Sequence, residues 1–185
     1  MTFANDPVRS PSKDRDPSTG ALVVLQHSHH EVHEGVAFVL SQRTAVNAFD
    51  IAAPLTFYIT TPAGDEGLHL VISGEANVPA FWELFEDNGN AAHFDVAGGS
   101  AAVPLNRNRN SATVPLVTVT TGATVTQATA DALIDTSAMG RAGGSERNEF
   151  ILKPSTEYLI RATSYVDNNE GSLTLGFYQH ESGGG

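Results

Sequence analysis

The chain has 185 residues, of which 41% are hydrophobic, and this length supports a single folded domain with a full core. Its 21 acidic residues outnumber its 10 lysines and arginines, and the formal net charge of −11 disfavours nucleic acid and anionic membranes as partners. The absence of cysteine excludes disulfides and thiolate metal sites. A partner protein with basic patches would fit this charge better.

The first 20 residues carry Pro7, Pro11 and Pro17 among charged side chains, so they cannot bury enough apolar area to fold alone. They are interpreted as a flexible tail or as an extended N-terminal arm that orders against a neighbouring subunit. The apolar run from Leu22 to Leu25 is far too short for a secretion signal or a membrane span. We therefore expect a soluble protein, or one that is released by lysis.

Short runs of apolar and β-branched residues then predict a series of strands. In chain order these are residues 21–27, 36–43, 55–61, 68–74, 81–86 and 114–121. Residues 87–90 (DNGN) predict a hairpin turn after the fifth strand. Residues 129–139 are the only candidate helix.

Three more strands with two turns are predicted at 147–153, 157–163 and 172–181, so that the chain closes with an antiparallel sheet. The predicted fold is all-β: a single jelly-roll-like antiparallel β-sandwich over residues 21–182. The arm (1–20) would precede it, and a flexible glycine tail (183–185) would follow.

Four histidines lie within residues 27–35 (HSHHEVHEG). On a strand, His27, His29 and His33 would point to one face and His30 to the other. Imidazoles spaced in this way can chelate a metal, and the order resembles the first motif of cupins, which are metal-dependent jelly rolls. The alternative is a polar strand edge or a subunit interface. We prefer this alternative and assign no metal or other cofactor.

Asparagines and arginines alternate in residues 104–111 (PLNRNRNS). A nucleic-acid site would need a broad basic patch with stacking aromatics, which the sequence lacks. The segment is interpreted as a loop whose asparagines satisfy backbone groups, or as a contact loop whose arginines bind partner carboxylates. The candidate residues for contact with a neighbouring subunit or another partner protein are Asn106, Arg107, Asn108, Arg109 and Asn110.

Phe81 and Phe85 would share one strand face, with Trp82 on the other. If the phenylalanines face the core, Trp82 would lie at a subunit interface, lie under a loop or stack on a sugar. The sequence holds no G-x-S-x-G motif and no phosphate-binding glycine loop. We therefore expect no enzyme activity and name no catalytic residue.

The closing strands contain the stretches "RNEFILKP", "EYLIR" and "FYQH". They resemble the end of a family of small β-rich virion proteins from tailed bacteriophages, and they carry most of the resemblance. His30, His33, Gly35 and Phe38 match an H-x-x-H-x-G-x-x-F stretch, and residues 104–111 match P-x-N-x-N-R-N-S. The resemblance spans residues 25–182. The chain departs from it in its proline-rich start and at Gln179.

The resemblance implies a non-enzymatic virion structural protein, namely a capsid decoration (cement) protein that binds the outer shell and stabilises the head. Its partners would be the major capsid protein of the same phage and itself, as a homotrimer. It would reside in the virion after assembly in the host bacterial cytoplasm. Two alternatives remain: a tail-associated receptor- or glycan-binding module that exposes Trp82, and a cupin-like enzyme with a metal at His27, His29 and His33.

Overall fold

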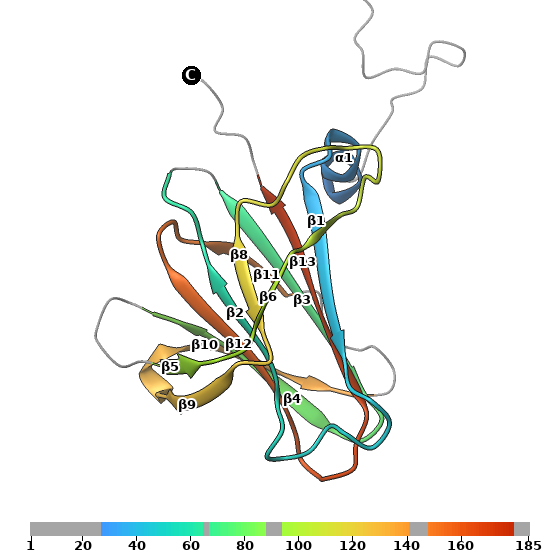
Figure 1. Cartoon of the computed structure of the whole chain (residues 1–185), viewed down its shortest axis with the longest axis vertical. Helices are drawn as coiled ribbons and strands as arrows, with labels where there is room; N and C mark the ends of the chain where they lie inside the picture. The colour runs from blue at the N-terminus through green and yellow to red at the C-terminus, as the bar shows by residue number, and fades with distance from the viewer. Residues whose placement is uncertain (1–26, 65–66, 88–93, 141–147, 180–185) are drawn as a thin grey trace, which may run out of the picture.

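The computed structural model describes residues 27–64, 67–87, 94–140 and 148–179 (Figure 1). Within these ranges the chain is nearly all β, with one α-helix, α1 (His27–Glu34), and one short 3-10 helix, η1 (Ala130–Ala132). The predicted arm (1–20) and glycine tail (183–185) lie outside the described residues.

Two antiparallel sheets pack face to face, which confirms the predicted all-β sandwich. The first sheet has the order β11 (Asn148–Leu152), β3 (Leu68–Ala76), β13 (Gly171–Gln179), β1 (Ala37–Arg43), β7 (Leu105–Asn106). The second has the order β10 (Leu133–Met139), β4 (Ala80–Glu86), β12 (Glu157–Ser164), β2 (Leu55–Thr60), β8 (Thr118–Thr121), β6 (Ser100–Ala102). A two-stranded sheet joins β5 (Phe94–Ala97) to β9 (Thr124–Ala128).

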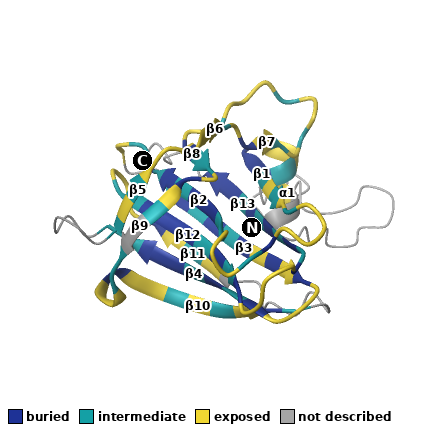
Figure 2. Ribbon diagram, turned by 60° about the horizontal axis from the view of Figure 1, so that its bottom comes forward, coloured by how far each residue is buried: buried dark blue, intermediate teal, exposed yellow. Residues whose placement is uncertain are grey.

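The core forms because alternate residues of each strand point between the sheets. In β3 the buried residues include Leu68, Leu70 and Ile72, and in β13 they include Leu175, which lies opposite Ile72. Figure 2 shows this burial along the strands and the exposure of the loops. A smaller cluster lies outside the main core, where Phe85 and Leu159 meet apolar residues of β5 and β9.

The last three strands form where the sequence predicts them, but they do not make one sheet. Strands β11 and β13 both pair with β3, whereas β12 lies between β4 and β2 in the second sheet. The predicted closing antiparallel sheet is therefore wrong. The chain crosses from one sheet to the other at the turns before and after β12. The sequence does not reveal these crossings, because side chains alternate in the same way in either sheet.

The candidate helix at 129–139 is wrong, because this segment is η1 followed by β10, which pairs with the free side of β4. The predicted hairpin turn at 87–90 lies outside the described residues except for Asp87. Among the described strands, β4 pairs with β10 and β12, and β5 pairs with β9. Of the predicted strand 114–121, only Thr118–Thr121 is in β8. Tertiary pairing, rather than local propensity, decides these segments.

Candidate functional site

Helix α1 ends in a cap that requires glycine. Gly35 has φ of +76°, its N–H donates to the carbonyl of Val32 at 3.1 Å, and the N–H of Val36 donates to that of Glu31 at 3.1 Å. This is the Schellman arrangement of a helix end. A Cβ at position 35 would also lie 2.4 Å from Ser111 Oγ. Gly35 therefore provides both the turn and the space in which the chain around Ser111 approaches the helix.

Two asparagines attach the segment after β7 to this helix end. Asn106 Nδ2 donates to the carbonyl of Gly35 at 2.7 Å, and Asn108 Nδ2 donates to the carbonyl of His33 at 3.1 Å. Their Oδ1 atoms accept backbone N–H groups two residues further on, from Asn108 at 2.9 Å and from Asn110 at 3.1 Å. The asparagines thus satisfy helix-end carbonyls and shape the loop, as one of the two interpretations predicts.

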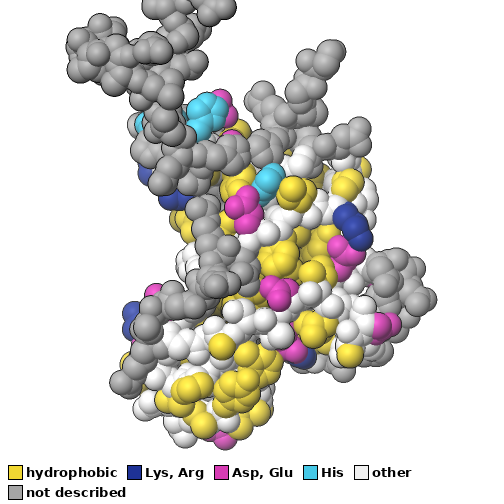
Figure 3. Space-filling view, turned by 180° about the vertical axis from the view of Figure 1, so that it is seen from behind, with side chains coloured by type: hydrophobic (Ala, Val, Ile, Leu, Met, Phe, Trp, Pro, Cys, Tyr) yellow, Lys and Arg dark blue, Asp and Glu magenta, His cyan; other side chains and the backbone are white. Residues whose placement is uncertain are grey.

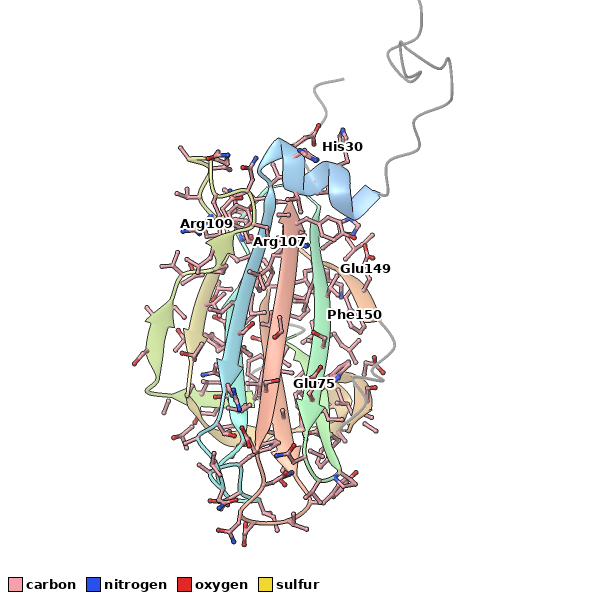
Figure 4. All side chains as sticks on the ribbon, turned by 90° about the vertical axis from the view of Figure 1, so that its right-hand side faces the viewer. His30, Glu75, Arg107, Arg109, Glu149 and Phe150 are labelled. Atoms are coloured by element: carbon pink, nitrogen blue, oxygen red, sulfur yellow. The ribbon has the colours of Figure 1, made fainter. Side chains whose placement is uncertain are left out.

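Arg107 and Arg109, which alternate with these asparagines along the chain, are exposed (Figure 4). Among the described residues, neither Arg107 nor Arg109 has a carboxylate partner. The other cations of the described chain are all paired, as Arg43 with Glu170, Lys153 with Glu86 and Arg161 with Glu83. The alternation of the sequence therefore separates two roles: Asn106 and Asn108 build the loop, and the arginines face solvent. Their contact with a partner stays a prediction.

Large aliphatic side chains accompany these arginines. We define residues 103–116 as the contact segment; its exposed aliphatic residues are Val103, Leu105, Val114 and Leu116, with Val103 69% and Val114 70% exposed. The end of the segment is fixed, because the N–H of Leu116 donates to Oε1 of buried Gln179 at 3.1 Å. Exposed aliphatic and arginine side chains on a rigid support are typical of protein interfaces.

A second exposed surface lies at the opposite end of the sandwich. Figure 3 shows hydrophobic side chains gathered at the lower end of the molecule. We define the apolar end patch as the exposed residues of the loops at that end: Val46, Ile51, Val78, Tyr165 and Val166. Buried Asn169 joins these loops, since its Nδ2 donates to the carbonyl of Val78 at 2.9 Å and its backbone pairs with that of Phe49.

The histidine segment is a helix, so the predicted strand and its one-sided alignment of His27, His29 and His33 are wrong. The sequence signal for this helix is Gly35, because a glycine directly after a segment of mostly polar and charged residues is typical of a helix C-terminal cap. His33 is exposed, and the side chains of His27 and His29 lie outside the described residues.

Three residues of metal-binding types do meet on α1. One donor atom each from His30, Glu31 and Glu34 lies within 4.8 Å of the others. However, His30 Nε2 is 3.2 Å from Glu34 Oε1, while His30 Nδ1 is 4.0 Å from Glu31 Oε1. The carboxylates flank opposite nitrogens of one ring, whereas metal ligands converge on a single point about 2 Å from each donor. The geometry suits an imidazole between two carboxylates.

Trp82 is 0% exposed and lies in the core, so the prediction that it contacts a ligand or partner is wrong. The predicted alternation along the strand is confirmed, because Phe81 and Phe85 share the face opposite Trp82. The prediction of which face points into the main core is wrong, because Trp82 and not the phenylalanines lies there. Phe81 packs on Tyr165 with ring centroids 5.1 Å apart, and Arg161 lies 5.2 Å from the Phe85 ring centroid.

The most strongly shifted titratable groups belong to the framework. Burial raises the pKa of Tyr158 above its usual range, and Glu86, which accepts its hydroxyl at 2.9 Å, adds to the shift. Burial and then Glu157 raise the pKa of Tyr58 to about 12. Both tyrosines stay protonated at neutral pH, so neither acts as a general base there.

Comparison of the chain with protein-family models, with curated proteins and with solved structures finds no match. Within the described residues, α1 is the only α-helix and is too short and too polar to cross a membrane.

Proposed function

We propose that the chain is a non-enzymatic virion structural protein, a capsid decoration protein that binds the outside of a phage head. The observation that carries the proposal is the contact segment, which presents four exposed aliphatic side chains and two arginines on a rigid support. Since neither arginine has a carboxylate partner among the described residues, the segment is suited to a partner that offers carboxylates. The resemblance to phage virion proteins includes this same segment.

We also propose that the sandwich is a jelly roll. The strand order supports this, because β1, β13, β3 and β11 are neighbours in one sheet and β2, β12, β4 and β10 in the other. Along the chain, β1 to β4 alternate between the two sheets, and β10 to β13 do the same. Each of the last four strands lies beside one or two of the first four, as in the two Greek keys of a jelly roll. The segment from β5 to β9 would be an insertion between two of these eight strands.

The two exposed surfaces suggest two kinds of contact. Copies of a chain with a net charge of −11 repel one another, so self-association favours a surface rich in apolar side chains, such as the apolar end patch. We propose that this patch joins the copies of a homotrimer and that the contact segment binds the major capsid protein. A subunit that used both would link its neighbours while it holds the shell.

The alternatives have less support. The glycan-binding alternative names Trp82 as the side chain that stacks on a sugar, and Trp82 is buried. A cupin-like enzyme would need an interior metal site, whereas large apolar side chains such as Phe57, Trp82 and Phe177 fill the space between the described sheets.

Co-sedimentation of the tag-free protein with mature heads, and in parallel with host cells, tests the proposal. We expect saturable binding to heads alone. Arg107→Ala with Arg109→Ala should weaken it at least tenfold and leave the unfolding midpoint unchanged. Arg43→Ala is the matched control, because Arg43 is an exposed arginine that pairs with Glu170 at the other end of β1. Binding to cells alone, or full binding by the double variant, would contradict the proposal.

The apolar end patch has its own test. Val46→Asp with Ile51→Asp should convert the oligomer to monomer in sedimentation equilibrium, since each places a charge in the proposed interface. Binding of the monomer to heads should persist with lower avidity. An oligomer of unchanged size would dismiss this patch as the self-contact.

A further inference from the structure

The outer face of the first sheet contains a hollow that the contact segment borders. Its volume is about 370 Å³, and its floor is the row Val39, Gly176, Val71, which are direct neighbours across three strands. Figure 4 looks onto this face, with α1 above it and Arg107 at the helix end. The volume is near the lower end of the range for ligand pockets, roughly 300 to 1,000 Å³.

The fold itself does not require the glycine at the centre of this floor. Gly176 is not among the residues of positive φ, and a Cβ there would meet Val71 Cβ at an ordinary 3.6 Å. In contrast, Gly74 and Gly171 in the same sheet make room for Met139 and Phe49, whose atoms would be 2.8 and 2.6 Å from an added Cβ. Glycine weakens a strand interior and often marks a close approach of a ligand or another chain.

The walls of the hollow differ in chemistry. Arg107 borders it at the helix end, and the guanidinium has no carboxylate partner among the described residues. Tyr178 forms part of the same end and stacks on His69, with ring centroids 4.5 Å apart. The hydroxyls of Ser73 and Thr174 border the other end. An aliphatic group therefore fits the floor, and a carboxylate fits the arginine.

We propose that this hollow receives an aliphatic side chain from a segment of the partner protein, with a neighbouring carboxylate of that segment bound by Arg107. The inference rests on the proposed function, since the partner is taken to be the shell protein. Charge complementarity supports a carboxylate, because Arg107 is a cation without a carboxylate partner in the described part of the chain. The absence of a side chain at Gly176 leaves space on the floor of the hollow, and a group from another protein could occupy that space.

Filling the hollow tests the proposal. Gly176→Thr should lower affinity for heads at least tenfold and raise or preserve the unfolding midpoint, because threonine favours a strand. Arg107→Gln should also weaken binding tenfold or more. Gly140→Thr is the matched control, since no atom lies within 4 Å of its added Cβ, and its affinity should equal that of the wild type. Full affinity of Gly176→Thr for heads would overturn the proposal.

A second measurement separates this inference from the proposed function. If the wild type does not bind heads, the proposed function fails, and the hollow is then tested with 4-methylpentanoate, which joins a leucine-like group to a carboxylate. We expect saturable shifts of the backbone amide resonances of Val39, Val71 and Gly176. The shifts should disappear in Gly176→Thr and weaken with 4-methylpentanamide. No shifts, or equal binding of the amide, would overturn the inference.

Discussion

The side-chain amide of Asn106 donates to the carbonyl oxygen of Gly35 at 2.7 Å and so joins segments that are 71 residues apart. Asn108 makes a second such bond to His33, in the same helix end. The histidine-rich stretch and the asparagine–arginine stretch, which look independent in the sequence, are therefore one structural unit. Its effect is to hold two arginines in fixed positions at the end of the sandwich.

Asn106→Ala should lower the free energy of unfolding by about 1 to 3 kcal/mol, because it leaves the part-buried carbonyl of Gly35 without its donor. The amides of the loop should then exchange hydrogen faster, while those of β12 stay protected. Denaturant unfolding and hydrogen exchange measure the two effects.

Asn110→Ala is the matched control for this change. Asn110 contributes only its backbone N–H to the described hydrogen bonds, so its replacement should change stability by less than about 0.5 kcal/mol. Equal losses in the two variants would contradict the role assigned to Asn106.

Gly35→Ala should be more destabilising than Gly122→Ala. Both glycines have positive φ, at 76° and 66°, so both changes carry the backbone strain of about 1 to 2 kcal/mol. Only at position 35 does the new Cβ also collide with Ser111, since nothing lies within 4 Å of a Cβ at 122. Thermal unfolding of the two variants measures the difference.

The double variant Gly35→Ala with Ser111→Gly removes the collision and keeps the strain. It should regain stability to near the level of Gly122→Ala. A double variant no more stable than Gly35→Ala would show that the approach of Ser111 is not the cause.

Strand positions were largely predictable, and strand partners were not. Alternation in residues such as Leu68, Leu70 and Ile72 depends only on which side chains are buried, so it marks β3 without reference to its neighbours. Pairing depends on contacts distant in sequence, and these place β10 beside β4 where the local sequence suggested a helix. The same limit hid the crossing of the last strands between two sheets.

The candidate site was predictable in part. Asparagine's short amide favours local backbone bonds, so the role of Asn106 and Asn108 followed from residue type. The helix around His30 was missed, although Gly35 one residue beyond it is the usual signal of a helix end. For β4, the alternation of side chains defines two faces but does not say which of them faces the core. Both faces are apolar, because Trp82 lies in the main core and Phe85 is buried in the smaller cluster on the other face.

Stability should fall above pH 10 in a manner that depends on Tyr158. Its folded pKa is raised above the ordinary 10.0, so the folded state holds this proton more tightly than the unfolded state does. The resulting stabilisation is complete below about pH 10 and is lost as the pH rises towards the folded pKa. Tyr158→Phe should be less stable at pH 8 but show a shallower decline above pH 10 in urea unfolding.

The control for this prediction is Tyr165→Phe, because Tyr165 is exposed. It should decline as steeply as the wild type. If the stability of Tyr158→Phe declined above pH 10 as steeply as that of the wild type, groups other than Tyr158 would cause the loss of stability at alkaline pH.

Trp82→Ala should cost about 3 to 5 kcal/mol, as removal of a buried aromatic ring does. Trp82→Phe should cost less, because it keeps a ring and removes an indole N–H that has no acceptor among the described residues. Calorimetric unfolding distinguishes these values. An alanine variant as stable as the wild type would contradict the core position of Trp82.

The position of the last strands has a consequence for synthesis. Strand β13 separates β1 from β3, and β12 separates β2 from β4, so both sheets are interrupted until the final segments are present. A growing chain that has emerged only as far as β11 holds apolar strands whose central partners do not yet exist. Folding must therefore wait for residues up to Gln179, and because these pairings span most of the chain, it should be slow and should depend on protection of the nascent strands from aggregation.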